Sequence, residues 1–237
     1  MHDTGGQNVS GAVCLVSGGL DSCVTAAMAQ SFNLPLAFLH VSYGQLAAQR
    51  EVEAFTRIAD HYQVSQRLVS NITHLSEMGG SALTDSSLEV PEGELDRKGI
   101  PVSYVPFRNA NMLSIATSWA EVLDFRFIYI GAVQEDSSGY PDCRESFFKA
   151  FGSVIEEGTK PDTSIQIMTP LIHLRKKEIV EKGKQLGAPF HLTWSCYQDQ
   201  EISCGCCDSC LLRLRGFQEA GIPDPLSYRE VPASTEP

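Results

Sequence analysis

A glycine-containing loop between an apolar strand and an amphipathic helix restricts the fold of this chain more than any other part of its sequence. Residues 12–16 are an apolar run, residues 17–22 read SGGLDS, and Val24, Ala27 and Met28 then follow at helical spacing. Glycines at such a point let the backbone approach an anion, and the free N–H groups and dipole of the first helical turn favour negative charge. The sequence therefore predicts a strand–loop–helix unit that cradles a phosphate or pyrophosphate group.

The loop differs from two common nucleotide-binding motifs. It lacks the Gly-Lys-Ser/Thr ending that aims a lysine at the terminal phosphates in P-loop kinases and ATPases, and it lacks the G-x-G-x-x-G pattern of dinucleotide-binding folds. Ser17 and Ser22 offer hydroxyl donors instead, and the Asp21 carboxylate could hold a magnesium ion or cap the helix. A plain turn with Asp21 as an ordinary N-cap is the simpler alternative.

Strand-like and helical segments alternate along the rest of the chain. Strand patterns occur at residues 36–41, 67–70, 127–133 and 165–168, and helical patterns at 47–62, 109–122, 145–157 and 176–186. This alternation predicts an α/β fold: an open, doubly wound, Rossmann-like parallel sheet. Glycines and prolines interrupt residues 78–106, which predicts a long loop excursion that is either functional or disordered. The first ten residues and residues 231–237 are expected to be loose tails.

Four cysteines near the C-terminus have the spacing of a metal site. Cys196, Cys204, Cys207 and Cys210 form the pattern C-x7-C-x2-C-x2-C, and zinc takes four soft ligands at the corners of a tetrahedron. Because protein thiolates would fill all four positions, the predicted zinc site is structural rather than catalytic.

Other interpretations of the cysteines stay open. An iron–sulfur cluster could use the same four thiolates, and Cys204 and Cys207 could form a redox-active dithiol. On spacing alone Cys206 could replace Cys207, and His191 is the one reserve ligand among the histidines. The remaining cysteines are most simply small buried side chains: Cys14, Cys23 and Cys143.

The charge balance bears on the partners of the chain. It has 18 Lys and Arg against 29 Asp and Glu, a formal net charge of −11. Since nucleic-acid binding draws most of its affinity from neutralised phosphates, small-molecule substrates are favoured over RNA or DNA. No apolar run approaches the roughly 20 residues that cross a bilayer, and residues 1–10 are unlike an export signal. We therefore expect a cytoplasmic protein with no membrane or nucleic-acid partner.

Residues 17–22 match the SGGxDS motif of the PP-loop ATP pyrophosphatases, which the chain resembles in its strand–loop–helix context. Enzymes of that group cleave ATP between its α and β phosphates and leave AMP on an oxygen of the substrate. The resemblance implies an adenine nucleotide alpha hydrolase-like fold. It also implies an ATP-binding segment made of Val16, Ser17, Gly18, Gly19, Leu20, Asp21, Ser22, Cys23, Val24, Thr25 and Ala26.

Further motifs narrow the resemblance to the 7-cyano-7-deazaguanine synthases of queuosine biosynthesis. They cover most of the chain, and they occur at residues 43–45 (YGQ), 81–85 (SALTD), 105–109 (VPFRN), 138–144 (SGYPDCR), 169–171 (TPL), 192–197 (LTWSCY) and 204–213 (CGCCDSCLLR). The resemblance implies a carbon–nitrogen ligase that converts 7-carboxy-7-deazaguanine and ammonia to the nitrile with ATP and Mg²⁺. It also implies a homodimer.

The resemblance suggests roles for four residues. Asp21 and Ser22 would organise magnesium and the leaving pyrophosphate, and Arg108 would reach the phosphates or the substrate carboxylate. Asp142 would accept hydrogen bonds from the guanine-like amine and ring N–H. The simpler alternatives are a solvated Arg108 at a helix start and Asp142 as a turn residue. We expect an ATP-binding domain at residues 1–190, with the zinc-binding segment 191–237 packed on it.

Three local features qualify this picture. The basic run 175–177 is expected to be a solvated helix face rather than an ATP contact. Leu46 and Ala47 stand where the family often has a basic or histidine pair, and Met112 stands where an aromatic residue is common. These departures put local contacts in doubt, and substrate binding too if residues 46–47 touch substrate.

Three rival functions are weighed against this one. A PP-loop enzyme that modifies tRNA is disfavoured by the acidic charge and by the absence of a tRNA-sized appended domain. A relative that passes a deazaguanine to a protein or nucleic-acid acceptor would keep the fold and the adenylation. A zinc-stabilised binding module without catalysis would turn over no ATP.

Overall fold

A computed structural model describes residues 10–85, 87–88, 99–134, 139–198 and 200–230. Three groups of predictions from the sequence lie outside these described residues. They are the two tails at residues 1–9 and 231–237, most of the second half of the loop excursion (residue 86 and residues 89–98), and Ser138 of the motif at 138–144.

The described residues contain one parallel sheet. Its strands are β1 (Ala12–Leu15), β2 (Leu36–Ser42), β3 (Gln66–Asn71), β4 (Phe127–Tyr129) and β5 (Gln166–Met168), in the spatial order β3-β2-β1-β4-β5. In the centre of the sheet, Ala12 pairs with Leu36 on one side and with Phe127 on the other. The chain therefore builds from β1 to one edge and then returns to build the other, which confirms the predicted open, doubly wound fold.

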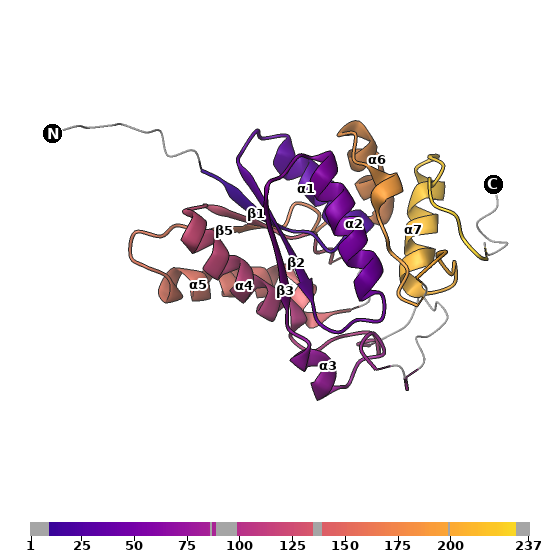
Figure 1. Cartoon of the computed structure of the whole chain (residues 1–237), viewed down its shortest axis with the longest axis horizontal. Coiled ribbons are helices and arrows are strands. Elements are labelled where there is room, and N and C mark those ends of the chain that lie inside the picture. Colours follow the sequence, from indigo (N-terminus) through magenta and orange to yellow (C-terminus); the bar gives the residue numbers. More distant parts are fainter. Residues whose placement is uncertain (1–9, 86, 89–98, 135–138, 199, 231–237) are drawn as a thin grey trace.

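Helices cover both faces of the sheet (Figure 1). One face carries α1 (Leu20–Gln30), α2 (Ala48–His61), α6 (Lys176–Gln185) and α7 (Asp208–Glu219), and the other carries α4 (Arg108–Leu123) and α5 (Glu145–Gly158). The short elements are α3 (His74–Met78), η1 (Pro141–Cys143) and η2 (Phe190–Leu192).

Strand β1 is buried on both faces and divides the core. Cys14 belongs to the apolar cluster that includes α1, α2 and α6, whereas Val13 and Leu15 belong to the cluster that includes α4 and α5. This alternation follows from the two-residue period of a strand, and it explains why the sequence of β1 is a continuous apolar run.

The C-terminal segment packs on the helical face formed by α1 and α6. Figure 1 shows α7 alongside α6. Phe217 of α7 lies in the same apolar cluster as α1 and α6, and its ring centroid is 5.2 Å from that of Phe190. The zinc-binding segment predicted from the cysteines thus shares its core with the α/β domain.

The sequence predicted most helices to within two residues, and it failed at two helices and at the end of one strand. Helices α3 and α7 were missed, the latter because it begins at Asp208, within a stretch interpreted only as a cysteine motif. Strand β4 ends at Tyr129 rather than at residue 133. Residues 130–133 leave the regular ladder, but they contribute to the pocket described below.

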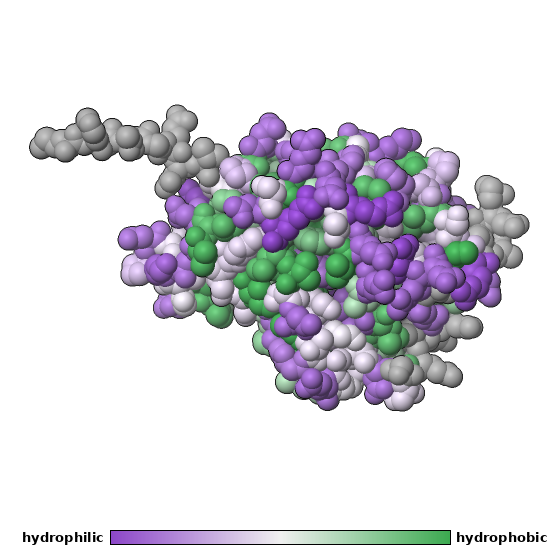
Figure 2. All heavy atoms as spheres, viewed as in Figure 1, coloured by the Kyte–Doolittle hydropathy of each residue, from purple (hydrophilic) through white to green (hydrophobic). Residues whose placement is uncertain are grey.

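The surface is mostly hydrophilic on the side shown in Figure 2. Hydrophobic residues gather in the middle of this side, where strands β2 and β3 lie in Figure 1, and Val69 of the edge strand β3 is 52% exposed. Over the described ranges, the structure contains no helix with both the length and the apolar character to cross a membrane.

Candidate active site and metal centre

A pocket opens where β1, β2 and β4 end, beside the point at which the strand order reverses. Ligands in open α/β sheets bind at this position. The glycine loop lines one end of the pocket. Side chains from several separate segments line the other end, namely Tyr43, Glu51, Arg108, Tyr140 and Tyr197.

Gly18 allows the loop to pass close to helix α2. Its φ is +95°, and a Cβ at this position would lie 2.7 Å from the carbonyl oxygen of Glu51 and 2.9 Å from Cβ of Ala54. A larger residue would therefore be strained by its backbone angle and would also collide with α2.

Hydroxyl groups fix the shape of the loop. Ser17 Oγ lies 3.1 Å from Ser22 Oγ, the Ser22 hydroxyl donates to the Gly19 carbonyl at 3.0 Å, and the Gly19 N–H donates to Ser17 Oγ at 3.3 Å. Helix α1 begins at Leu20, so its first N–H groups lack partners within the helix. The structure thus brings the predicted serines and glycines together in a loop with the geometry of an anion cradle.

Lys176 binds the loop aspartate, which corrects one expectation from the sequence. Its Nζ donates to both carboxylate oxygens of Asp21 at 2.8 Å, and its side chain is only 13% exposed. A Cβ at Gly216 of α7 would lie 2.5 Å from Lys176 Cγ, so the glycine provides the space for this side chain. Lys176 is therefore a pocket residue, whereas its neighbours Arg175 and Lys177 are solvated as predicted.

Arg108 also lines the pocket. Its Nη1 donates to the Tyr43 hydroxyl at 3.1 Å, and its guanidinium carbon lies 5.1 Å from the Tyr43 ring centroid and 6.0 Å from that of Tyr140. Its Nε is buried without a hydrogen-bond partner within the described residues. Arg108 is thus a cation held against aromatic rings, with donor capacity left for an anionic ligand.

Asp142 does not line the pocket. It is buried in η1, where its Oδ2 accepts the backbone N–H of Asn109 at 2.9 Å and its carbonyl accepts from the Asn109 side chain at 2.8 Å. A carboxylate at the start of α4 stabilises the free N–H groups of that helix. Asp142 therefore holds the first turn of α4, which carries Arg108, and its Oδ1 is buried without a hydrogen-bond partner among the residues that the structure describes.

Glu51, which the sequence analysis did not identify, occupies the pocket instead. Its Oε2 accepts a hydrogen bond from Gln45 Nε2 at 2.7 Å, and Gln45 Oε1 in turn accepts the Tyr43 N–H at 2.8 Å. Burial raises the pKa of Glu51 to about 7, against the lowering effects of Gln45 and Arg108. The motif at residues 43–45 could be recognised in the sequence, but Glu51 lies outside it, and no pattern in the sequence marked Glu51 as a site residue.

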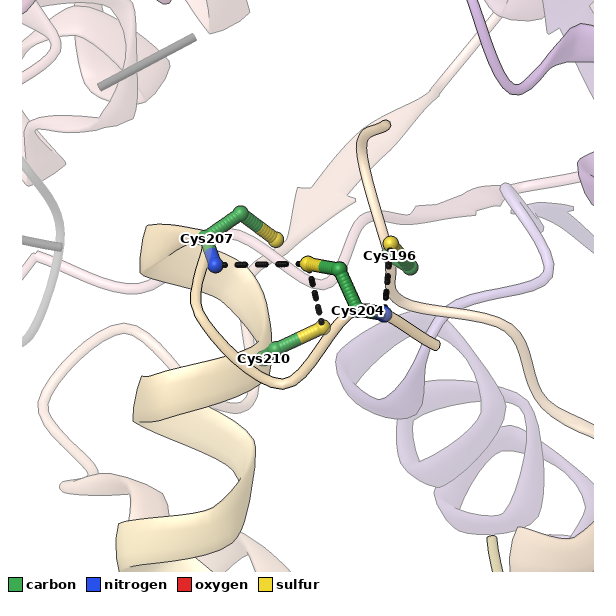
Figure 3. A group of neighbouring side chains, drawn as sticks. All are labelled: Cys196, Cys204, Cys207 and Cys210. Atoms are coloured by element: carbon green, nitrogen blue, oxygen red, sulfur yellow. Dashed lines mark hydrogen bonds between the residues drawn. The ribbon is translucent and has the colours of Figure 1, made fainter. Parts of the chain in front are cut away.

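The four predicted zinc ligands converge. The sulfur atoms of Cys196, Cys204, Cys207 and Cys210 are all within 4.8 Å of one another, and all four residues are buried (Figure 3). Cys204 Sγ lies 3.8 Å from Cys210 Sγ, which matches the separation of about 3.8 Å expected for ligands 2.3 Å from a tetrahedral zinc ion. The backbone N–H of Cys207 donates to Cys204 Sγ at 3.4 Å. Such a donor set fits zinc.

Deprotonation of the crowded thiols is unfavourable when no cation is bound. The pKa of Cys210 is raised above its ordinary value, first by hydrogen bonds with the sulfurs of Cys196 and Cys207 and then by burial. A bound metal ion reverses this effect because it stabilises thiolates directly. The four cysteines thus form a candidate metal centre.

Trp194 connects the metal centre to the glycine loop. Its backbone N–H donates to the Gly18 carbonyl at 2.9 Å, and its indole N–H donates to the Cys196 carbonyl at 3.1 Å. The Arg50 guanidinium covers its ring at 4.5 Å. The segment held by the cysteines therefore closes against the loop, and it contributes Trp194, Ser195 and Tyr197 to the pocket.

A buried arginine also holds the segment around Trp194 in place. Arg213 of α7 is 1% exposed and forms two bonds to Asp224, from Nε at 2.7 Å and from Nη2 at 2.9 Å. Its Nη1 donates to Thr193 Oγ1 at 2.7 Å and to Ser195 Oγ at 3.3 Å. Since the charge is paired and its donors are satisfied, Arg213 is suited to a positioning role beside the pocket.

The doubly wound sheet with an SGGxDS loop at its switch point defines a PP-loop-type α/β protein. Two solved structures share the fold. A 4-thiouridine synthetase in an RNA complex with bound ATP has a TM-score of 0.51 at 22% identity, over 92% of this chain and 47% of that one. The U34-tRNA thiolase NcsA from Methanococcus maripaludis, with its [4Fe-4S] cluster, has a TM-score of 0.50 at 16% identity, over 83% of this chain and 62% of that one.

Sequence comparison identifies the family within this class. The model of the queuosine biosynthesis protein QueC matches residues 11–221. The 7-cyano-7-deazaguanine synthase of Chlorobium phaeobacteroides (strain DSM 266) is 56% identical over 93% of this chain and 98% of its own length. The 7-cyano-7-deazaguanine synthase of Chloroherpeton thalassium is 55% identical over 94% of this chain and 98% of its own length. The chain belongs to the QueC family of queuosine biosynthesis proteins.

Proposed function

We propose that this chain converts 7-carboxy-7-deazaguanine and ammonia to 7-cyano-7-deazaguanine at the expense of ATP. The observation that carries the proposal is the family match over residues 11–221, together with relatives of that name at 55–56% identity over almost their whole length. The pocket supports it, because a single cavity joins an anion cradle to an aromatic and ionic end that suits a heterocyclic acid.

The chemistry has two adenylation steps. A carboxylate oxygen attacks the α phosphorus of ATP and pyrophosphate leaves; ammonia then displaces AMP and gives the amide. The amide oxygen attacks a second ATP in the same way, with pyrophosphate as the leaving group, and loss of AMP and of both N–H protons leaves the nitrile. Oxide is a poor leaving group and AMP a good one, so one adenylating site can serve both steps. The protein contributes positioning and charge stabilisation rather than covalent catalysis.

The glycine loop would hold the departing pyrophosphate. In this proposal residues 16–26 bind ATP through the backbone of the loop and the first turns of α1, and Ser22 donates to a phosphate oxygen. Lys176 adds a positive charge beside Asp21, which helps to neutralise the leaving group. Asp21 would help to hold magnesium, which would supply positive charge to the phosphates.

The remaining parts of the site fall into two groups. Arg108 would bind the substrate carboxylate, since a guanidinium suits a planar pair of oxygens. Zinc on the four cysteines would have a structural role, because all of its positions are filled by protein and Trp194 transmits the position of the centre to the loop. We also propose a homodimer that works in the cytoplasm.

The proposal is tested by incubating the purified chain with ATP, Mg²⁺, ammonium and 7-carboxy-7-deazaguanine. We expect the nitrile by mass spectrometry, AMP by chromatography, and about one zinc ion per chain by elemental analysis. Formation of ADP with no nitrile would contradict the proposal. A protein or nucleic-acid acceptor is the runner-up, and it predicts that nitrile forms only in traces while a deazaguanine adduct accumulates on the acceptor.

A further inference from the structure

Two carboxylates line the pocket within the described residues, and they differ in their partners. Asp21 is bound by Lys176 through both oxygens. Glu51 forms no ion pair in the described part of the chain, and only its Oε2 accepts a hydrogen bond, from Gln45. Glu51 therefore presents an acceptor to the pocket that the adenylation chemistry does not use.

The position of Glu51 is fixed from two sides. Gln45 links the Tyr43 backbone to the carboxylate, with Oε1 accepting from one and Nε2 donating to the other. The backbone of Glu51, in the first turn of α2, is in contact with Gly18 of the glycine loop. The backbone of Glu51 is thus fixed against the loop, and its carboxylate is held by Gln45.

The chemistry of a carboxylate selects which part of the substrate can lie there. Phosphates and the substrate carboxylate are anions, which Glu51 repels. The guanine-like ring carries two N–H donors side by side, on N1 and on the 2-amino group, at the edge remote from the 7-carboxyl group. A carboxylate can accept from both, and paired donors of this kind discriminate strongly between bases. Tyr43, Tyr140 and Tyr197 provide aromatic surface beside this edge.

We propose that Glu51 binds the N1–H and 2-amino group of the deazaguanine and thereby selects a guanine-like ring over one without the amino group. This proposal rests on the proposed function, and it moves the reading of the ring from Asp142, which lies outside the pocket, to a residue of α2. Arg108, which is hydrogen-bonded to Tyr43 at the same end of the pocket, is left for the acidic end of the substrate.

Binding constants test the assignment most directly. The full chain, saturated with zinc and with a non-hydrolysable α,β-methylene analogue of ATP, is titrated with 7-carboxy-7-deazaguanine and with the same compound lacking the 2-amino group. We expect the unaltered chain to prefer the amino compound by about 10–100-fold, because one lost contact of a bidentate pair costs about 1–3 kcal/mol. Glu51→Gln should weaken binding of the amino compound by about 100-fold and reduce the preference to a few-fold.

Two further variants guard the interpretation. Asp60→Asn removes an exposed carboxylate from the same helix, where it pairs with Arg67 at the surface, and should leave both constants unchanged. Glu51→Asp keeps the charge but shortens its reach, and should retain part of the preference while thermal stability and zinc content stay constant. Because Glu51→Gln removes a poorly solvated charge, it should fold as well as the parent chain.

The outcomes separate the two proposals. If the unaltered chain releases AMP with 7-carboxy-7-deazaguanine but Glu51→Gln retains the full preference for the 2-amino group, Glu51 does not read the ring and the inference is wrong. A lower rate of nitrile formation with unchanged binding constants would also overturn it, since that result assigns Glu51 to ammonia. If the unaltered chain neither binds the compound nor releases AMP, the proposed function fails first.

Discussion

The two ends of the pocket are built in different ways. The glycine end consists largely of backbone from one continuous segment, residues 17–22, with its shape set by Gly18 and two serines. The opposite end consists of side chains from separate segments, among them Tyr43, Glu51 and Arg108. A backbone cradle suits the phosphates of ATP, the substrate that such enzymes share, whereas a set of side chains can be changed one at a time to suit a particular acceptor.

The difference predicts how substitutions should act. Changes at the glycine end should abolish adenylation of any acceptor, and changes at the side-chain end should alter which acceptor is bound while ATP cleavage remains possible.

Asp21→Asn should have the largest effect. The substitution removes the charge that holds Lys176 in the pocket and that offers magnesium an oxygen, so two contributions to phosphate binding are lost together. We expect AMP release to fall by about 1,000-fold, the upper range for removal of one electrostatic contribution to a transition state. AMP chromatography measures the effect, and zinc content should stay constant. A loss of zinc in parallel would mean that the aspartate supports folding rather than chemistry.

Gly18→Ala should have the next largest effect. The new methyl group would collide with the Glu51 carbonyl and force the loop away from α2, and a displacement of about 1 Å in a reacting group costs on the order of 100-fold in rate. Gly221→Ala is the matched control, since Gly221 also has a positive φ but has no atom within 4 Å of the added Cβ. The control should lose about 1 kcal/mol of stability and keep its rate of AMP release. Equal losses of rate in both variants would refute the collision.

The sequence predicted the backbone end of the pocket, the metal centre and Arg108 of the side-chain end, but not Glu51 or the contacts that hold these side chains. Residues 17–22 and three of the four cysteines are neighbours along the chain, so that local spacing encodes their geometry. The contact of Lys176 with Asp21 joins residues 155 positions apart, and that of Arg108 with Tyr43 joins residues 65 apart. Such contacts depend on how α4, α6 and α7 pack in three dimensions. The helical pattern of a sequence predicts that a helix forms, but it does not predict how that helix is oriented.

Asp142 and Glu51 also show that the sequence alone does not predict which carboxylate enters the pocket. Both are carboxylates close to motifs that resemble the family's, and the sequence favoured Asp142 because it follows a buried strand. The structure gives Asp142 a partner in the Asn109 N–H, whereas the first turn of α2 brings Glu51 to the pocket. Gly18 lets α2 pack close to the loop. This close packing could not be predicted from the hydrophobic pattern of α2 itself.

The pH dependence of acceptor binding tests the side-chain end. Because burial raises the pKa of Glu51 to about 7, a falling pH should protonate it and remove one of its two acceptor positions. Binding of 7-carboxy-7-deazaguanine should therefore tighten as pH rises, by about tenfold between pH 6 and pH 8. The neighbouring groups do not titrate in this range, since Arg108 stays charged and burial raises the pKa of Tyr43 to about 12.

The variant that tests the origin of this dependence is Glu51→Gln. Titration calorimetry at several pH values should give a flat profile for it, in contrast to the parent chain. If the profile of the variant keeps its slope, another group is responsible, and the side-chain end has been assigned to the wrong carboxylate.

Asp142→Asn should have the smallest effect. Asparagine caps a helix about as well as aspartate, so the bond to the Asn109 N–H can persist and the stability should change by less than about 1 kcal/mol. Since Asp142 lies outside the pocket, affinity for 7-carboxy-7-deazaguanine should stay within about threefold, equivalent to about 0.7 kcal/mol. Asp142→Ala, which cannot cap, should cost about 1 kcal/mol of stability and lower the rate through misplacement of Arg108. A large loss of affinity in Asp142→Asn, with stability and ATP binding unchanged, would return the reading of the ring from α2 to η1.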